Sequence, residues 1–337
     1  MKAAQALEQA RLGYKLVPVT IRQLLYLSST PCDFYIQENG LYVELLRKNT
    51  YIDNDVIREL IQNNQIHLFI YADDKKELIA VQQENLRQVT RSLSIGDALE
   101  KGKKQTNLLA INMGYLYEFP MEDDLLQLQY QSVVNLFRFL FENTSIHEQL
   151  YLDFKKYKHH YIFSQPFLSS LFLLGVLKMS HVYSEKELEN LFVTSYFKDI
   201  GMSAVPIEKY NEKELSEHDK KLLSRHADIS VDILQGRLPI SPNHLKIIEG
   251  HHAFSLLSDD LSEVKKENSL VITGTETVMV ACMDIISAMI SERPYRGSTS
   301  LFEALEMIKI LISDSYPNEF RLIVTYFKNF FAKTMRK

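Results

Sequence analysis

Cysteine is nearly absent from this chain, which excludes a small domain held together by disulfides. Only Cys32 and Cys282 occur among 337 residues, and they lie far apart in dissimilar surroundings. This usage is typical of proteins of a reducing cytoplasm. The N-terminal stretch MKAAQALEQARLGYK has no apolar signal core, so we expect a cytoplasmic protein.

Long hydrophobic runs and a strong charge of one sign are also missing. The most apolar run, FLSSLFLLGVL at 167–177, is too short to span a bilayer and predicts a buried helix. The formal net charge of −5 gives no general attraction to nucleic acid or anionic lipid. With 46% hydrophobic and 24% charged residues, the composition is that of a soluble globular protein. We expect no membrane span and no nucleic-acid partner.

No internal repeat, low-complexity segment or Gly/Ser linker marks a domain boundary, but the residue pattern changes along the chain. Residues 15–71 favour a small α+β unit of strands, a hairpin and a short helix. The expected elements are a strand in YKLVPVT, a hairpin around Glu38, Asn39 and Gly40, a helix over 54–64 capped by Asn54, and a strand in IHLFIYA. From about residue 75 onward, helical periodicity dominates.

We therefore predict a mainly α protein in three parts. These parts are a small α+β N-terminal domain with a helical extension (1–120), a connecting helix (121–160) and a helical C-terminal domain (161–337). The long periodicity over 124–157 also leaves a homodimer open, because a dimerising helix and a helix joining two domains would look the same.

An aspartate lies where a core residue is expected, in the stretch SYFKDIGMSAVP. Ser184 and Glu187 form a capping box that begins a helix, and Asp199 falls near the middle of its apolar stripe. A buried carboxylate without a partner is costly, so it should have a cation or several hydrogen-bond donors beside it. The alternative is an aspartate exposed by fraying of the last helical turn.

Three further segments also place polar side chains among apolar ones. His226 shares a face with Leu222 in the helix that begins at Ser216, His251 and His252 close SPNHLKIIEGHH, and Asp284 is the single charge in VMVACMDIISAMI. A lone histidine of this kind is more often a core residue than a ligand. Together, imidazole and carboxylate donors without thiolate predict a transition-metal site suited to iron, manganese or zinc.

The segments that carry these residues resemble the HD-GYP domain, the bacterial cyclic-di-GMP phosphodiesterase branch of the HD superfamily. The resemblance covers about 160–330. SYFKDIGMSAVP resembles the stretch beginning HDIGK, IIEGHHAF resembles the HHE element, and ACMDIISAMISERPYR resembles the segment ending in RPYR. The resemblance implies an HD-type helical bundle with a two-metal phosphodiesterase site.

Carried over by residue, the resemblance implies a metal-ligand set. Asp199 would bridge two metals, with His226, His251 and His252 completing the ligands of the second and Asp284 binding the first. Arg293 and Arg296 would contact substrate phosphate; for Arg293, a structural salt bridge is an equal alternative.

The departures from the family pattern fall mainly on the first metal position. Lys198 replaces the histidine of the HD pair, and Met202 replaces the lysine that ends HDIGK. A protonated lysine cannot act as an imidazole ligand. Lys198 and Met202 would therefore fill the site, and we expect the Lys198 ammonium within hydrogen-bond reach of Asp199 or Asp284.

Two further family features are missing. At the place of the first ligand histidine the chain has Ser164, Gln165 and Pro166, while His159 and His160 come about one and a half turns too early. HHE has become His251-His252-Ala253, and SLLSDDLSEVKKENSL replaces the GYP loop; this polar stretch predicts a solvated loop.

These observations favour a catalytically impaired HD-GYP-type protein with one metal retained. It would act in cyclic-di-GMP-related signalling by binding a signalling protein or the cyclic dinucleotide. The alternative is an active metal-dependent cyclic-di-GMP phosphodiesterase with an unconventional site that recruits His159 or His160. A purely structural relative without metal is a third, less favoured interpretation.

Overall fold

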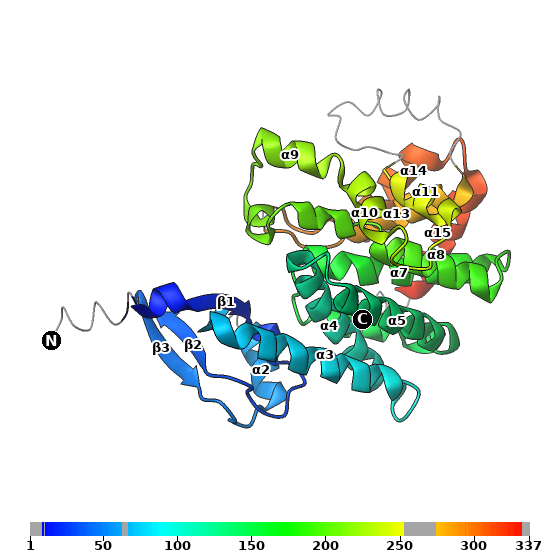
Figure 1. The fold of residues 1–337 in the computed structure, drawn as a ribbon. Helices are drawn as coiled ribbons and strands as arrows, with labels where there is room; N and C mark the ends of the chain where they lie inside the picture. The colour runs from blue at the N-terminus through cyan, green and yellow to red at the C-terminus, as the bar shows by residue number, and fades with distance from the viewer. Residues whose placement is uncertain (1–8, 10, 63–66, 253–273, 295, 332–337) are drawn as a thin grey trace. The chain divides into compact units, whose positions relative to one another are not determined.

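The computed structural model describes residues 9, 11–62, 67–252, 274–294 and 296–331 (Figure 1). The chain divides into two compact units. The first comprises Met1–Asn112 and Leu152–His159, and the second comprises Met113–Tyr151 and His160–Lys337. The three-part division at residues 120 and 160 stays a prediction.

The first unit contains a four-stranded antiparallel sheet in the order β1-β4-β2-β3. Its strands are β1 (Leu16–Thr20), β2 (Phe34–Glu38), β3 (Leu41–Leu46) and β4 (His67–Tyr71). Asn39 and Gly40 join β2 to β3 with φ of 50° and 79°, the left-handed pair that a two-residue hairpin requires. The predicted strands and hairpin are confirmed.

Helical segments complete the first unit. They are η1 (Ile21–Leu24), α2 (Asn54–Gln62), η2 (Ala72–Asp74), α3 (Lys75–Arg91) and the start of α4 (Ala98–Glu118). The predicted cap is wrong, because the Asn54 side chain accepts the Tyr26 N–H at 2.6 Å. Instead, Asp53 Oδ1 accepts the Asp55 N–H at 2.8 Å at the start of α2.

The second unit is a helical bundle. Its helices are α5 (Asp123–Glu142), η3 (Thr144–Ile146), α6 (His147–Lys155, whose last turn belongs to the first unit), α7 (Tyr161–Ser180), α8 (Glu185–Phe197), η4 (Ile200–Ala204), η5 (Ile207–Asn211), α9 (Glu217–Leu223), α10 (His226–Leu234), α11 (Pro242–Glu249), α13 (Thr275–Met289), α14 (Leu301–Ile312) and α15 (Pro317–Phe330). Helix α7 packs against α8, α13 and α15. The predicted mainly α fold with a small N-terminal α+β part is confirmed.

Helix α7 contains the apolar run that the sequence identified. The helix has 20 residues, so by length and composition it could cross a membrane, but 67% of its most apolar window is buried inside the protein. Because α8, α13 and α15 cover it, α7 has the features of a core helix.

Two helices predicted as continuous are interrupted. The periodicity over 121–160 belongs to two α-helices, α5 and α6, because the backbone leaves the helical region at Asn143 (φ −113°, ψ 50°). The helix that begins after Ser216 likewise ends at Leu223, and His226 begins α10. A hydrophobic period can continue through a short break, so periodicity alone does not reveal such interruptions.

Candidate metal centre

Asp199 lies just beyond the C-terminus of α8 rather than within the helix. The predicted capping box of Ser184 and Glu187 begins α8, and Phe197 is its last residue. Asp199 then precedes η4 with φ −101° and ψ 10°, and its backbone carbonyl accepts the Tyr117 hydroxyl at 2.8 Å. The residue is only 7% exposed, so the alternative of a frayed, exposed aspartate is wrong.

Gly201 allows the segment after Asp199 to approach α10 closely. A Cβ atom at this position would lie 2.1 Å from the His226 carbonyl oxygen and 2.5 Å from the Ser230 nitrogen. The Gly201 N–H instead donates to Ser230 Oγ at 2.8 Å. This contact joins η4 to the first turns of α10 and holds Asp199 near His226.

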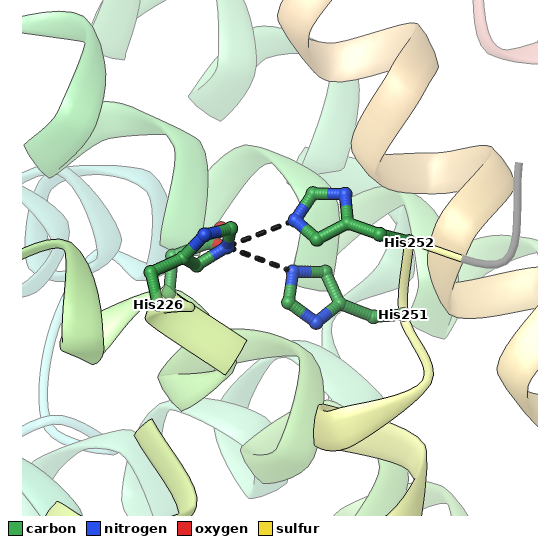
Figure 2. Close-up of side chains that lie close together, drawn as sticks. His226, His251 and His252 are labelled. Atoms are coloured by element: carbon green, nitrogen blue, oxygen red, sulfur yellow. Dashed lines mark hydrogen bonds and ion pairs between the residues drawn. The ribbon is translucent and has the colours of Figure 1, made fainter. Parts of the chain in front are cut away.

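The three predicted ligand histidines lie close together (Figure 2), and Asp199 lies beside them. His226 is the first residue of α10, while His251 and His252 follow the end of α11. The four side chains each offer one ligand atom, and these atoms all lie within 4.8 Å of one another. His226 Nε2 is 2.8 Å from His252 Nε2 and 3.4 Å from His251 Nε2. Asp199 Oδ1 is 3.1 Å from His251 Nε2.

Backbone carbonyls set the tautomers of two of these histidines. His226 Nδ1 lies against the Leu223 carbonyl and His251 Nδ1 against the Ile248 carbonyl. A carbonyl only accepts, so each Nδ1 must carry a proton and each neutral ring presents an Nε2 lone pair to the cluster. Histidine ligands of metals usually have such a hydrogen bond on the other ring nitrogen.

The Asp199 carboxylate and the facing histidine nitrogens of the cluster favour a cation between them. Burial would lower the pKa of His226, but its hydrogen bond to Asp199 and the charge of that carboxylate raise the pKa above its usual value. Burial, with His251 and His226 as neighbours, lowers the pKa of His252 to about 3. Facing Nε2 lone pairs repel unless a proton or a metal lies between them.

Lys198 is completely buried beside two carboxylates. Its ammonium forms ion pairs with Asp199 Oδ2 and with Asp284 Oδ1. Burial alone would lower the pKa of Lys198, but the charges of the two aspartates raise it. Burial would raise the pKa of Asp199, yet the charge of Lys198, with hydrogen bonds from His226 and His251 in their protonated forms, holds it well below its usual range. Lys198 is therefore a cation at neutral pH.

Gln165 is the residue of this centre that the sequence did not assign. Its Nε2 donates to Asp284 Oδ1 at 2.8 Å, so Asp284 is held by Gln165 as well as by Lys198. Gln165 comes from α7, at the place where the HD-GYP resemblance would have a ligand histidine. The signal was one amide side chain beside Pro166 in the first turns of an apolar helix.

The remaining predicted site residues lie outside the four-residue cluster. Met202 is half-buried in η4. The Arg293 guanidinium lies over the Tyr161 ring at 4.8 Å from the ring centroid, and its phosphate-binding and salt-bridge roles both stay predictions. Arg296 is exposed and donates to the Ala288 carbonyl at 3.0 Å. Their main chains pair with each other in both directions.

His159 and His160 do not belong to the four-residue cluster. His159 Nε2 lies 2.7 Å from Asn107 Oδ1 within the first unit, and His160 Nε2 lies 3.2 Å from Asn211 Oδ1 in the second. Ala253 and the stretch SLLSDDLSEVKKENSL lie outside the described residues.

The donor set fits a single transition-metal ion. Three imidazole nitrogens and one carboxylate oxygen are ligands that zinc, iron and manganese accept in proteins. The close Nε2 atoms of His226 and His252, 2.8 Å apart, are compatible with a shared cation. Among the described residues, His252 is the most exposed member of the group.

Comparison with solved structures finds a protein that shares this fold. The chain is similar to Bd1817, described as an HDG"Y"P protein from Bdellovibrio bacteriovorus, with a TM-score of 0.63. The match covers 93% of this chain and 99% of that chain at 13% sequence identity. No protein-family model and no curated protein matches the sequence. At this level of identity, the similarity shows that the two chains share a fold.

Proposed function

We propose that this protein is a catalytically impaired HD-GYP-type protein that keeps one metal and acts in cyclic-di-GMP-related signalling by binding. Asp199, His226, His251 and His252 would hold the metal. The observation that carries the proposal is the Lys198 ammonium, which lies buried between Asp199 and Asp284. A cytoplasmic location is part of the proposal.

Lys198 supports a single-metal centre because it occupies space and supplies charge. The carboxylates of Asp199 and Asp284 together carry two negative charges, and the ammonium neutralises one of them. A second metal cation near Asp284 would lie close to the Lys198 ammonium. The two positive charges would repel each other strongly at this short distance. Gln165, bonded to the same carboxylate oxygen, is a neutral group in place of an imidazole ligand.

One metal with these neighbours is poorly suited to phosphodiester hydrolysis. In a two-metal site both cations acidify the attacking water and hold the phosphate. Here Met202 also stands where the resemblance has a lysine. The loss of one transition-state contact typically costs about 10²–10³ in rate, so the loss of a metal and a lysine together should cost more.

Binding of cyclic-di-GMP would involve the arginines that follow α13. Arg296 is exposed, and Arg293 lies over Tyr161. Both side chains can form paired hydrogen bonds to phosphate oxygens. Tyr161, which Arg293 contacts, lies one helical turn before Gln165 in α7. Gln165 in turn donates to Asp284, so this helix connects the arginine segment to the Asp284 side of the centre. A signalling protein is the other binding partner that the proposal admits.

The decisive experiment measures metal content and hydrolysis on the same purified protein. We expect about one zinc, iron or manganese ion per chain by elemental analysis, and no hydrolysis of cyclic-di-GMP or an aryl phosphodiester above the metal-only rate. Two metals per chain, with cyclic-di-GMP hydrolysis that disappears in Asp199→Ala, would establish the alternative of an active phosphodiesterase.

Nucleotide binding has its own test and control. In a calorimetric titration with cyclic-di-GMP, Arg296→Gln should weaken binding at least tenfold, whereas Arg321→Gln, at an exposed arginine of α15, should not. Absence of binding by the unmodified protein would leave a signalling protein as the partner.

A further inference from the structure

Strand β3 lies at one edge of the sheet in the first unit (Figure 1). It pairs with β2 on one side, and within the described residues the strand order gives it no neighbour on the other side. Glu38 and Leu41 flank the two-residue hairpin loop and form a hydrogen-bonded pair. Because the main-chain groups of successive residues alternate in direction, Tyr42 and Glu44 direct their N–H and C=O groups away from β2.

A side-chain amide binds the outward-facing main chain of Tyr42. Gln9 Oε1 accepts the Tyr42 N–H at 2.7 Å, and Gln9 Nε2 donates to the Tyr42 carbonyl at 3.3 Å. One amide group thus makes both hydrogen bonds that the facing residue of an adjacent strand would make. The edge of β3 is therefore open to a partner from outside the sheet, and Gln9 competes with any strand that pairs there.

The side chains of β3 leave apolar surface exposed along this edge. Leu41, Val43 and Leu45 are 41%, 43% and 40% exposed. The strand contains no proline or lysine, which are residues that commonly prevent pairing at the edge of a sheet. Its one charged residue, Glu44, forms an ion pair with Arg47 at 2.6 Å. No net charge therefore opposes the approach of another strand to β3.

We infer that β3 pairs with β3 of a second copy of this chain, as antiparallel strands that continue the sheet across a dimer. The occupant is a second copy because the strand is complementary to itself. In the register centred on Val43, Tyr42 of each copy exchanges main-chain hydrogen bonds with Glu44 of the other. Leu41 then lies opposite Leu45, and the two Glu44 carboxylates do not face each other, so like charges are not opposed.

The dimer is weak because Gln9 must leave Tyr42 before the strands can pair. Gln9 and the second strand use the same N–H and C=O groups. The regular part of β3 is also short, since the register shifts opposite Phe34 and Tyr35. Dimerisation should therefore depend on protein concentration and should increase when the Gln9 amide is removed.

Analytical ultracentrifugation of the full-length protein over a range of concentrations measures the dimer. Gln9→Ala removes the competing amide and should lower the dissociation constant about tenfold. Val43→Lys places two ammonium groups opposite each other and should abolish the dimer, both alone and combined with Gln9→Ala. Val56→Lys is the matched control, because Val56 is 51% exposed and lies on α2, outside the proposed interface.

An engineered disulfide tests the register. In the proposed pairing the two Val43 residues form a non-hydrogen-bonded pair with Cα atoms about 4.5 Å apart, inside the range of about 4.4–6.8 Å found for disulfides. Val43→Cys should therefore give a cross-linked dimer under mild oxidation, whereas Val56→Cys should not. The native Cys32 and Cys282 are both buried, so they do not compete in this reaction.

Three results would overturn the inference. The first is the absence of self-association in both the unmodified protein and Gln9→Ala at every concentration at which they stay soluble. The second is a dimer that persists unchanged in Val43→Lys, which would place the contact elsewhere, for example in the helical segment 124–157. The third is a Val43→Cys protein that dimerises without forming the disulfide. None of these outcomes depends on metal content or on hydrolysis.

Discussion

Lys198 is a fully buried cation among the described residues. Its side chain has no exposed surface, and its ammonium lies between two carboxylates that are themselves 10% and 14% exposed. Removing one member of a buried ion pair leaves the other charge without compensation, at a cost of about 3–5 kcal/mol. Removal of the Lys198 ammonium would leave two carboxylates, Asp199 and Asp284, without their partner.

We therefore expect Lys198→Met to destabilise the metal-free protein by about 3–5 kcal/mol, measured by urea unfolding in the presence of a chelator. Lys209→Met, at a lysine whose side chain is 41% exposed in a pair with Glu212, should change stability by less than about 1 kcal/mol. Equal stability of Lys198→Met and the unmodified protein would show that this ion pair is not what holds Asp199 and Asp284 in place.

The histidines of the cluster give a second prediction at the same scale. His226→Ala or His252→Ala should abolish retained metal, since each removes one of four donors that lie within 4.8 Å of one another. Elemental analysis after dialysis measures this loss. His244→Ala should retain the metal, because His244 faces Ser241 at the start of α11, where its Nδ1 is 2.6 Å from the hydroxyl. Equal metal in all three variants would refute the ligand assignment.

At the scale of elements, the approach of η4 to α10 brings Asp199 to the histidines. Gly201 is the residue that this approach depends on, because a Cβ would overlap two main-chain atoms of α10. Main chain cannot move aside as a flexible side chain can, so the two elements must separate.

Gly201→Ala should therefore cost about 1–3 kcal/mol of stability through overpacking and should also weaken metal retention. Chemical unfolding and elemental analysis of the same sample check both effects. Gly297→Ala is the control, since a Cβ there would meet nothing within 4 Å and the residue does not have a positive φ. A Gly201→Ala protein with normal stability and full metal would show that η4 and α10 can shift without consequence.

At the scale of the whole molecule, a buried histidine outside the metal centre makes stability depend on pH. His147, at the start of α6, is 4% exposed, and its Nε2 is 2.9 Å from the Leu140 carbonyl. Burial lowers the pKa of His147 to about 4, whereas in the unfolded chain it is about 6.5. Between these values the unfolded state binds a proton that the folded state does not, so stability falls as pH falls.

This difference should cost about 3 kcal/mol between pH 7 and pH 4, at 1.36 kcal/mol per pKa unit. In His147→Gln, which keeps an N–H donor for the Leu140 carbonyl, this part of the acid destabilisation should be absent. Urea unfolding of both proteins at pH 7 and pH 4 isolates the effect, because the metal-centre histidines are the same in each. A parallel loss of stability in the two proteins would contradict the buried-histidine explanation.

The sequence by itself determined the local features of this protein. The hairpin at Asn39 and Gly40 and the helix start at Ser184 depend on backbone conformation and capping within a few residues, so short-range pattern predicts them. The ligand candidates were also readable, because a polar residue such as Asp284 in an apolar helix must find a partner. The helical bundle of the second unit was predicted from helical periodicity.

Only the tertiary structure decided what these residues touch. Lys198 pairs with both Asp199 and Asp284, and Gln165 of α7 holds Asp284 of α13 across 119 positions of sequence. The closeness of η4 and α10 likewise brings together segments that are separate in the chain. Such contacts depend on how elements pack, and packing is a property of the whole fold that a local residue pattern does not contain.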